Sequence, residues 1–231
     1  KTGKKVLEES FEYIYYEAGL LQVHKDSKHG LITPSTLEYA QEMTLEDYPR
    51  IYKHQGEFFF KVNENGRWGI VNQYGKRLLP NIYSKIYGRL TESQPAIVLL
   101  GGSYKVVDAQ NKTLKTLPYT TLLSDNLEDE YFITVSQNQL QGVIRSDGQE
   151  IIPPLYERVS KFKNIFLALQ ADGKQILLDS LGKRIGNETF EDYNYKGYRS
   201  IGEQYAEVLQ KGKVGAINAQ GKLIIPCLYQ R

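Results

Sequence analysis

The sequence predicts an all-β repeat protein built from about six four-stranded units. Three observations support this prediction: a strand-turn-strand segment recurs along the chain, its apolar residues keep a fixed register, and glycines recur at the same two places. The segment is clearest at residues 66–83, 141–153 and 214–226. Radial closure of the units into a β-propeller is our first expectation, because closure protects strand edges, and an open β-solenoid is the alternative.

The register of the copies is defined by an anchor position, which is glycine in four of them and falls at residues 30, 69, 105, 142, 176 and 215. The anchors are 34–39 residues apart, within the range of repeat architectures. Seven residues before the anchor stand Val23, Val62, Val98, Val135, Leu169 and Val208. Nine before stand Leu21, Phe60, Ala96, Ile133, Leu167 and Ala206, and two after stand Ile32, Val71, Val107, Ile144, Leu178 and Ile217. The two-residue step between the first two columns is the period of a strand with one buried face.

A second glycine position lies six residues after the anchor. Its residues are Gly75, Asn111, Gly148, Gly182 and Gly221, while Thr36 stands there in the first copy. Asparagine among glycines indicates a backbone with positive φ, so we expect a tight turn between two strands. Eight residues later each copy has an aromatic residue: Tyr83, Tyr119, Tyr156, Phe190 and Tyr229. Pro80, Pro153 and Pro226 are expected to end the third strand, because proline cannot donate a ladder hydrogen bond.

The repeat predicts a single domain that covers residues 1–231. Its units are expected at 18–55, 56–92, 93–128, 129–163, 164–202 and 203–231, after a partial unit at 1–17. The unit at 18–55 diverges most from the others. Within it, residues 38–49 are expected to form a short helical turn or an enlarged loop.

Composition limits the classes of partner. The net charge is +2 over 231 residues, with acidic and basic residues interspersed, so the chain lacks the electrostatic footprint of a protein that binds nucleic acid or anionic membrane. The longest apolar run, Ala96 to Leu100, is too short to span a bilayer, and we expect no membrane insertion. The single cysteine, Cys227, has no partner for an intramolecular disulfide and is expected to be a small buried residue.

One copy carries a motif that resembles a known family. Arg67-Trp68-Gly69-Ile70-Val71, followed by Gly75-Lys76, Leu78-Leu79-Pro80 and Tyr83, is similar to the bacterial WG-type repeat, also called the KWG repeat. The resemblance covers nearly the whole chain, although only one copy has tryptophan, and its anchors are Trp68, Gly69, Gly75, Gly142, Gly148, Gly215 and Gly221. It implies a β-rich bacterial protein, often exported, without catalytic residues. It therefore favours the periplasm or cell envelope over the cytoplasm.

Motifs that carry chemistry are missing from the sequence. His24, His29 and His54 all lie in the first unit, outside any metal-binding motif, and are expected to be exposed residues at strand ends. No P-loop, nucleophile elbow or dinucleotide fingerprint occurs. We therefore expect no metal, no cofactor and no enzymatic activity.

Two irregular segments are candidate binding sites. The loop of the first unit contains Glu46, Asp47 and Tyr48, and an enlarged segment of the fifth unit contains Tyr193, Tyr195, Tyr198 and Arg199. Tyrosine and arginine are enriched at the energetic centres of protein interfaces. The first functional hypothesis is a non-catalytic scaffold that binds another protein, with an inhibitor or an immunity protein as one form. The alternative is a carbohydrate-binding or glycan-active propeller, with tyrosines and carboxylates around a pocket at its central channel.

Overall fold

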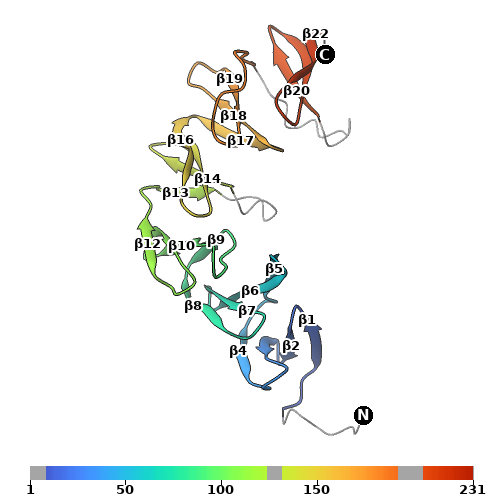
Figure 1. The fold of residues 1–231 in the computed structure, drawn as a ribbon, viewed down its shortest axis with the longest axis vertical. Helices are drawn as coiled ribbons and strands as arrows, with labels where there is room; N and C mark the ends of the chain where they lie inside the picture. The colour runs from blue at the N-terminus through green and yellow to red at the C-terminus, as the bar shows by residue number, and fades with distance from the viewer. Residues whose placement is uncertain (1–8, 124–131, 192–204, 231) are drawn as a thin grey trace. The chain divides into compact units, whose positions relative to one another are not determined.

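The computed structural model describes residues 9–123, 132–191 and 205–230, and every regular element in these ranges is a β-strand (Figure 1). The strands form six antiparallel sheets in chain order, which confirms the predicted all-β repeat class. Two compact units are present, Lys1–Leu117 with Ser146–Gly148, and Pro118–Arg145 with Gln149–Arg231. The single domain and its closure into a propeller stay predictions.

The first of these two compact units contains three sheets, in which neighbouring strands follow one another in sequence. The first sheet contains β1 (Tyr13–Glu17), β2 (Leu20–Lys25), β3 (Lys28–Ile32) and β4 (Tyr39–Leu45). The second contains β5 (Arg50–His54), β6 (Glu57–Glu64), β7 (Arg67–Asn72) and β8 (Arg77–Tyr83). The third contains β9 (Lys85–Tyr87), β10 (Ala96–Leu100), β11 (Ser103–Val107) and β12 (Thr113–Thr116).

The second compact unit contains the other three sheets. The fourth sheet contains β13 (Thr121–Leu123), β14 (Phe132–Gln137), β15 (Leu140–Arg145) and β16 (Glu150–Tyr156). The fifth contains β17 (Arg158–Phe162), β18 (Ile165–Leu169) and β19 (Gln175–Asp179). The sixth contains β20 (Tyr205–Gln210), β21 (Lys213–Asn218) and β22 (Leu223–Tyr229). In the second sheet, β5 lies in the sequence unit 18–55, whereas β6, β7 and β8 lie in the unit 56–92. Sheets and sequence units are therefore offset by one strand.

The hairpin turns explain how short polar segments reverse the chain. Asn65 and Gly66 connect β6 to β7, and both have positive φ (50° and 73°). Two consecutive positive φ values define the type I′ turn, whose twist matches that of the flanking strands. Ala18 and Gly19 make the same kind of turn between β1 and β2 (φ 54° and 93°).

The anchor glycine is required by a bulge in the fourth strand. The anchor-bearing strand and the strand that follows it shift register in all five sheets where such a pair is described. The bulge brings the carbonyl oxygen of Leu79 within 2.8 Å of the place where a Cβ on Gly69 would lie. Pro80 lies inside β8 at this bulge, which tolerates a residue without an N–H. The predicted strand end at Pro80, Pro153 and Pro226 was therefore wrong, since β8, β16 and β22 continue through them.

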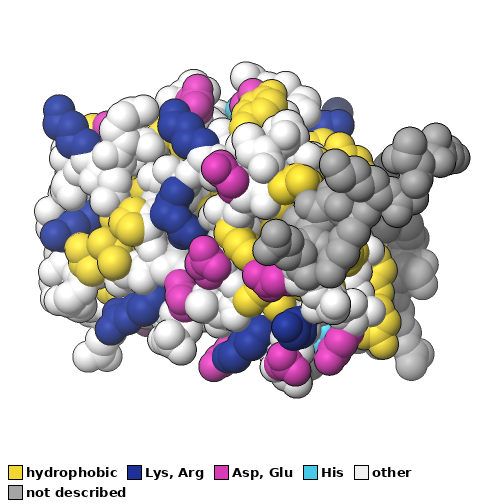
Figure 2. All heavy atoms as spheres, turned by 90° about the horizontal axis from the view of Figure 1, so that it is seen from below, with side chains coloured by type: hydrophobic (Ala, Val, Ile, Leu, Met, Phe, Trp, Pro, Cys, Tyr) yellow, Lys and Arg dark blue, Asp and Glu magenta, His cyan; other side chains and the backbone are white. Residues whose placement is uncertain are grey.

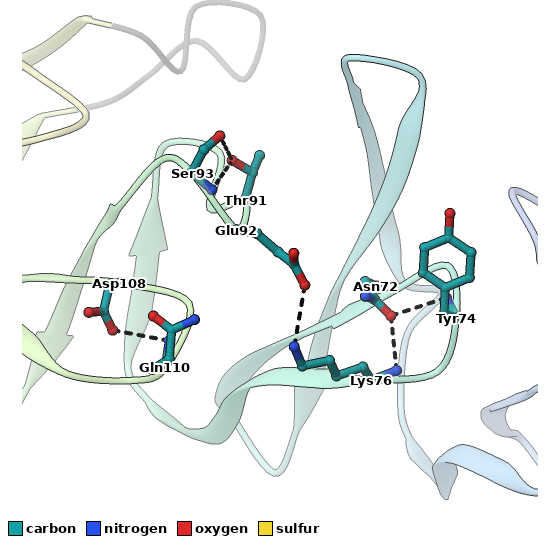
Figure 3. Close-up of polar contacts among 8 residues, drawn as sticks. All are labelled: Asn72, Tyr74, Lys76, Thr91, Glu92, Ser93, Asp108 and Gln110. Carbon is teal, nitrogen blue, oxygen red and sulfur yellow. Dashed lines mark hydrogen bonds and ion pairs between the residues drawn. The ribbon is translucent and has the colours of Figure 1, made fainter.

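The turn after the third strand is closed by a side chain that the sequence reading did not single out. The Oδ1 atom of Asn72 accepts hydrogen bonds from the backbone N–H groups of Tyr74 (3.1 Å) and Lys76 (2.9 Å), as Figure 3 shows. The same pair of bonds recurs at Asp108, Asp179 and Asn218. An Asx side chain three residues after the anchor therefore holds the repeat turn in four sheets of the described chain.

The second glycine position has the predicted backbone. Gly75 has φ 83° and Asn111 has φ 63°, which confirms the expected positive φ. In the first sheet, where Thr36 stands at this position, the positive φ falls on the next residue, Leu37 (61°). The reason is a turn one residue longer, in which the N–H of Thr33 bonds to the carbonyl of Glu38.

Successive sheets within each unit bury apolar faces against one another. Leu20 and Leu31 of the first sheet pack in one core with Phe60, Val62 and Val71 of the second. Equivalent cores join the second sheet to the third, the fourth to the fifth, and the fifth to the sixth. The residue two positions after the anchor is buried in all six sheets, as the register predicts. The core is thus a series of joints between neighbouring repeats.

The fifth sheet departs from the predicted register by one residue. Phe166 pairs with Leu178, whereas Phe60 pairs with Val71, and the loop between β18 and β19 is longer than a two-residue turn. A shift of one residue exchanges the two faces of a strand. Leu167 and Leu169 were therefore assigned to the wrong column, and Phe166 and Ala168 are the true equivalents, packed with the fourth sheet.

Residues 39–45 form β4, so the predicted helical turn or enlarged loop over 38–49 was wrong for most of that segment.

Charges of both signs are mixed on the surface. Figure 2 shows Lys and Arg interspersed with Asp and Glu on the visible face, with hydrophobic side chains in small patches between them. In the described ranges no helix has the length and hydropathy needed to cross a membrane. Cys227 is half-buried with a free thiol, and burial raises its pKa.

Candidate functional site

One of the two predicted binding segments can be placed. Glu46, Asp47 and Tyr48 follow directly after β4, at the end of the first sheet. Tyr48 is exposed. Tyr193, Tyr195, Tyr198 and Arg199 lie outside the described residues. The candidate site is therefore built on the first sheet.

A row of aromatic rings crosses the first sheet and ends at Tyr48. The ring of His29 of β3 contacts Tyr48 at a tilt, with ring centroids 4.0 Å apart, and contacts His24 of β2 at a similar tilt and 4.6 Å. His24 in turn contacts Tyr13 of β1 at 5.8 Å, and Tyr13 stacks on Tyr15 at 6.3 Å. We call these five residues the aromatic ladder. The ladder follows from the strand register, in which Tyr13 pairs with His24 and His24 pairs with His29.

The two histidines are not the exposed strand-end residues that we expected. His29 is buried among the rings, and His24 is mostly covered. Burial lowers the pKa of His29, the neighbouring His24 lowers it further, and the carboxylate of Asp47 opposes both effects. The ladder therefore favours a neutral His29.

Carboxylates border the ladder. The Oε2 atom of Glu12 lies 3.0 Å from Nδ1 of His24, although this contact does not have hydrogen-bond geometry. Glu46 pairs with Lys28 across 3.6 Å, and both side chains are solvent-exposed. Asp47 lies close enough to His29 to affect its pKa. The ladder thus offers flat ring faces beside acceptor oxygens.

The strand β1 carries the exposed end of the ladder. All five residues of β1 are exposed, and Tyr16 reaches 71%. The first strands of the next four sheets each bury at least one residue, as Tyr52 of β5 shows at 8% exposure. Tyr52 occupies the position of Glu17, donates to the carbonyl of Leu90 and packs on Phe59. In the described chain, β1 is an edge strand that pairs only with β2.

The chemical groups of the aromatic ladder and of the β1 edge suit binding rather than metal coordination. Among the described residues, no group of three or more His, Cys, Asp or Glu side chains is placed to hold a metal ion. The ladder instead combines tyrosine rings, a free strand edge and carboxylates, which together suit an extended peptide segment.

Sequence reasoning identified Tyr48 but missed its partners. The signal was present, because Tyr13-Ile14-Tyr15-Tyr16 concentrates aromatic residues in a strand next to two histidines that face each other across a hairpin. The missing step was to place residues 13–17 as the first strand of a sheet rather than in the tail of a preceding unit.

The repeat itself is matched by a family model. The model of the WG containing repeat matches residues 142–174 and 215–231. The first segment includes β16 and β18, and the second includes β22. Two segments of this chain match the WG containing repeat. The predicted resemblance is confirmed, and Gly142 and Gly215, the anchors of β15 and β21, begin the two matched segments.

The sequence and the structure were also compared with other known proteins. No curated protein matches the sequence. Among solved structures, BamB from Moraxella catarrhalis is 14% identical, with 89% of this chain and 69% of that chain covered and a TM-score of 0.37. Hsv2 from Kluyveromyces lactis is 10% identical, with 87% and 70% covered and a TM-score of 0.42. Apo AztD from Citrobacter koseri is 12% identical, with 99% and 75% covered and a TM-score of 0.37.

Proposed function

We propose that this WG-repeat chain is a non-catalytic protein-binding scaffold that holds its partner on the aromatic ladder and the free edge of β1. The observation that carries the proposal is the exposure of every residue of β1, in a repeat whose other first strands all bury side chains within the described chain. Exposed aromatic residues on a strand with one unpaired edge are a feature of interaction surfaces, because soluble proteins usually protect such edges.

The surface favours an extended segment of a partner protein. Backbone groups on the free edge of β1 can pair with an added strand, and the alternating side chains of that strand would then meet Tyr13 and Tyr15 on one face. The carboxylates of Glu12, Glu46 and Asp47 favour lysine or arginine in the partner, and tyrosine faces attract the same cations. A tight complex of one scaffold with one target would make the protein an inhibitor or an immunity protein.

Affinity capture from the native host tests this proposal. The immobilised chain is compared with the double variant Tyr15→Ser, Tyr16→Ser and with the control Tyr74→Ser, whose tyrosine is also exposed but lies on a turn of the second sheet. We expect one stoichiometric protein to be captured by the wild type and the control and lost from the double variant. Equal capture by all three proteins would contradict the assignment of the site.

Carbohydrate binding is the alternative that the same variants address. Tyrosine faces also stack on sugars, so the three proteins are tested on a glycan array. Ladder-dependent glycan binding without a captured protein would replace the scaffold proposal with the carbohydrate-binding alternative.

A further inference from the structure

One hairpin turn of the second sheet contains an Asn-Gly pair, the only such pair in the sequence. Asn65 and Gly66 connect β6 to β7, and both residues are solvent-exposed. Asparagine followed by glycine is the pair most prone to spontaneous deamidation, because glycine has no side chain to obstruct the reaction. A Cβ added to Gly66 would meet no heavy atom within 4 Å other than those of its chain neighbours. The turn therefore meets the steric requirement for this modification.

The reaction uses the backbone nitrogen of Gly66 as its nucleophile. This nitrogen loses its proton to hydroxide and attacks Cγ of the Asn65 side chain, and the side-chain amide nitrogen then leaves as ammonia. The product of this step is a cyclic succinimide. Water opens the succinimide ring at either carbonyl group, which gives aspartate or isoaspartate. The net change is the loss of ammonia and the gain of water, so no enzyme, oxidant or cofactor is required.

A neighbouring side chain holds this nucleophile. The N–H of Gly66 donates a hydrogen bond to Oδ1 of Asn63, with 3.1 Å between nitrogen and oxygen. Asn63 is half-buried near the end of β6 and pairs with Trp68 of β7, so strand pairing fixes its position. An N–H that donates a hydrogen bond gives up its proton less readily, and its nitrogen is held toward the acceptor. We propose that Asn65 is a deamidation site and that Asn63 slows the reaction by holding the Gly66 N–H.

The modification would disrupt the hairpin that lies at the centre of the second sheet. The φ values of Asn65 and Gly66, 50° and 73°, fit a two-residue type I′ connection. Isoaspartate adds a methylene group to the main chain, so the connection no longer matches the register of β6 and β7. These strands pack on both neighbouring sheets, through Phe60 toward the first and Ile70 toward the third. Conversion of Asn65 to isoaspartate is therefore expected to loosen both joints.

Peptide mapping by mass spectrometry, after incubation of the whole folded chain in mildly alkaline buffer, tests this proposal. The wild type is compared with Asn63→Ala, which removes the acceptor, and with the matched control Asn63→Asp, which keeps an oxygen at the same place. We expect Asn65 to deamidate roughly threefold to tenfold faster in Asn63→Ala than in the wild type, the range that corresponds to one hydrogen bond. Asn63→Asp is expected to react no faster than the wild type.

Equal rates in the wild type and Asn63→Ala would overturn the proposal, as would an Asn63→Asp variant that reacts as fast as Asn63→Ala. The wild type in urea gives a second comparison that needs no variant. Unfolding breaks the bond between Gly66 and Asn63, so Asn65 is expected to deamidate faster in urea than in the folded chain. An Asn65 that stays intact in urea, or that reacts there no faster than in the folded chain, also overturns the proposal. The tyrosine variants of β1 are expected to deamidate at the wild-type rate, so this test is independent of the proposed scaffold function.

Discussion

At the residue scale, the turns of the repeat are stabilised by a few side chains that accept backbone hydrogen bonds. Asn72 and its equivalents each satisfy two backbone N–H groups in a turn, and only Asn or Asp performs this role in the four sheets described with it. The short polar side chain matters because it reaches the backbone two and four residues ahead. The sequence contains this column, but short polar residues in turns are so common that the column does not stand out.

Replacing Asn72 tests its role as a hydrogen-bond acceptor in the turn. Asn72→Ala is expected to lower the free energy of unfolding by about 1–2 kcal/mol, because the two N–H groups lose their acceptor. Urea denaturation measures the change. Asn72→Asp is the matched control, since Asp108 and Asp179 make the same bonds, and it is expected to stay within about 0.5 kcal/mol of the wild type. Equal losses in both variants would contradict the acceptor role.

The ladder makes stability depend on pH through His29. Burial and His24 lower the pKa of His29 in the folded chain. As the pH falls below about 6.5, the unfolded chain takes up a proton at this histidine before the folded chain does, so the free energy of unfolding falls. Below the lowered folded-state pKa this loss reaches its limit.

Thermal unfolding of His29→Phe between pH 7.5 and pH 5 checks this linkage. Phenylalanine keeps a ring against Tyr48 and cannot titrate, so the variant is expected to lose less stability on acidification than the wild type. A wild-type pH dependence in His29→Phe would show that another group is responsible.

At the element scale, the strands were predictable where their turns were regular. Valines in the column seven residues before the anchor lie on buried strand faces, as expected for Val62 and Val98. The prediction failed in the fifth sheet, because the longer loop before β19 shifted Phe166 into the place assigned to Leu167. It failed at Pro80 because a bulge, which depends on the partner strand, lets a strand continue through proline.

The turn glycine couples one sheet to the next. A Cβ on Gly182 would collide with the backbone carbonyl of Ile151 in the fourth sheet, and the residue has φ 78°. Gly173 has nearly the same φ, 77°, with open space around it. Gly173→Ala is therefore expected to cost about 1 kcal/mol, from the backbone conformation alone.

Gly182→Ala is expected to cost about 1–3 kcal/mol more than Gly173→Ala, because the methyl group must displace backbone of the neighbouring sheet. Denaturant midpoints of the two variants, measured with the wild type, give the difference. Equal midpoints would show that the turn does not pack against the fourth sheet as described.

At the scale of the whole molecule, the sequence predicted six repeated sheets, but only part of the candidate site. Tyr48 was chosen for its loop, whereas His24, His29 and Tyr13 join it through strand pairing, which becomes visible in the sequence only once residues 13–17 are placed as the first strand of the sheet. The exposure of Ile225 was likewise unpredictable, because its sequence context, Ile-Ile-Pro, is the same as that of the buried Ile152. Periodicity predicts which residues share a face, and the neighbouring sheets decide which faces are buried.

Amide hydrogen exchange of the whole chain, followed by mass spectrometry, tests most directly whether the repeated sheets form the frame and β1 its open edge. We expect slow exchange in the two inner strands of the four-stranded sheets, such as β6 and β7, because both edges of these strands are hydrogen-bonded. We expect β1 to exchange faster than β5, whose Tyr52 is buried and bonded to Leu90. Fast exchange throughout β6 and β7, or protection of β1 equal to that of β2, would contradict this structure of the chain.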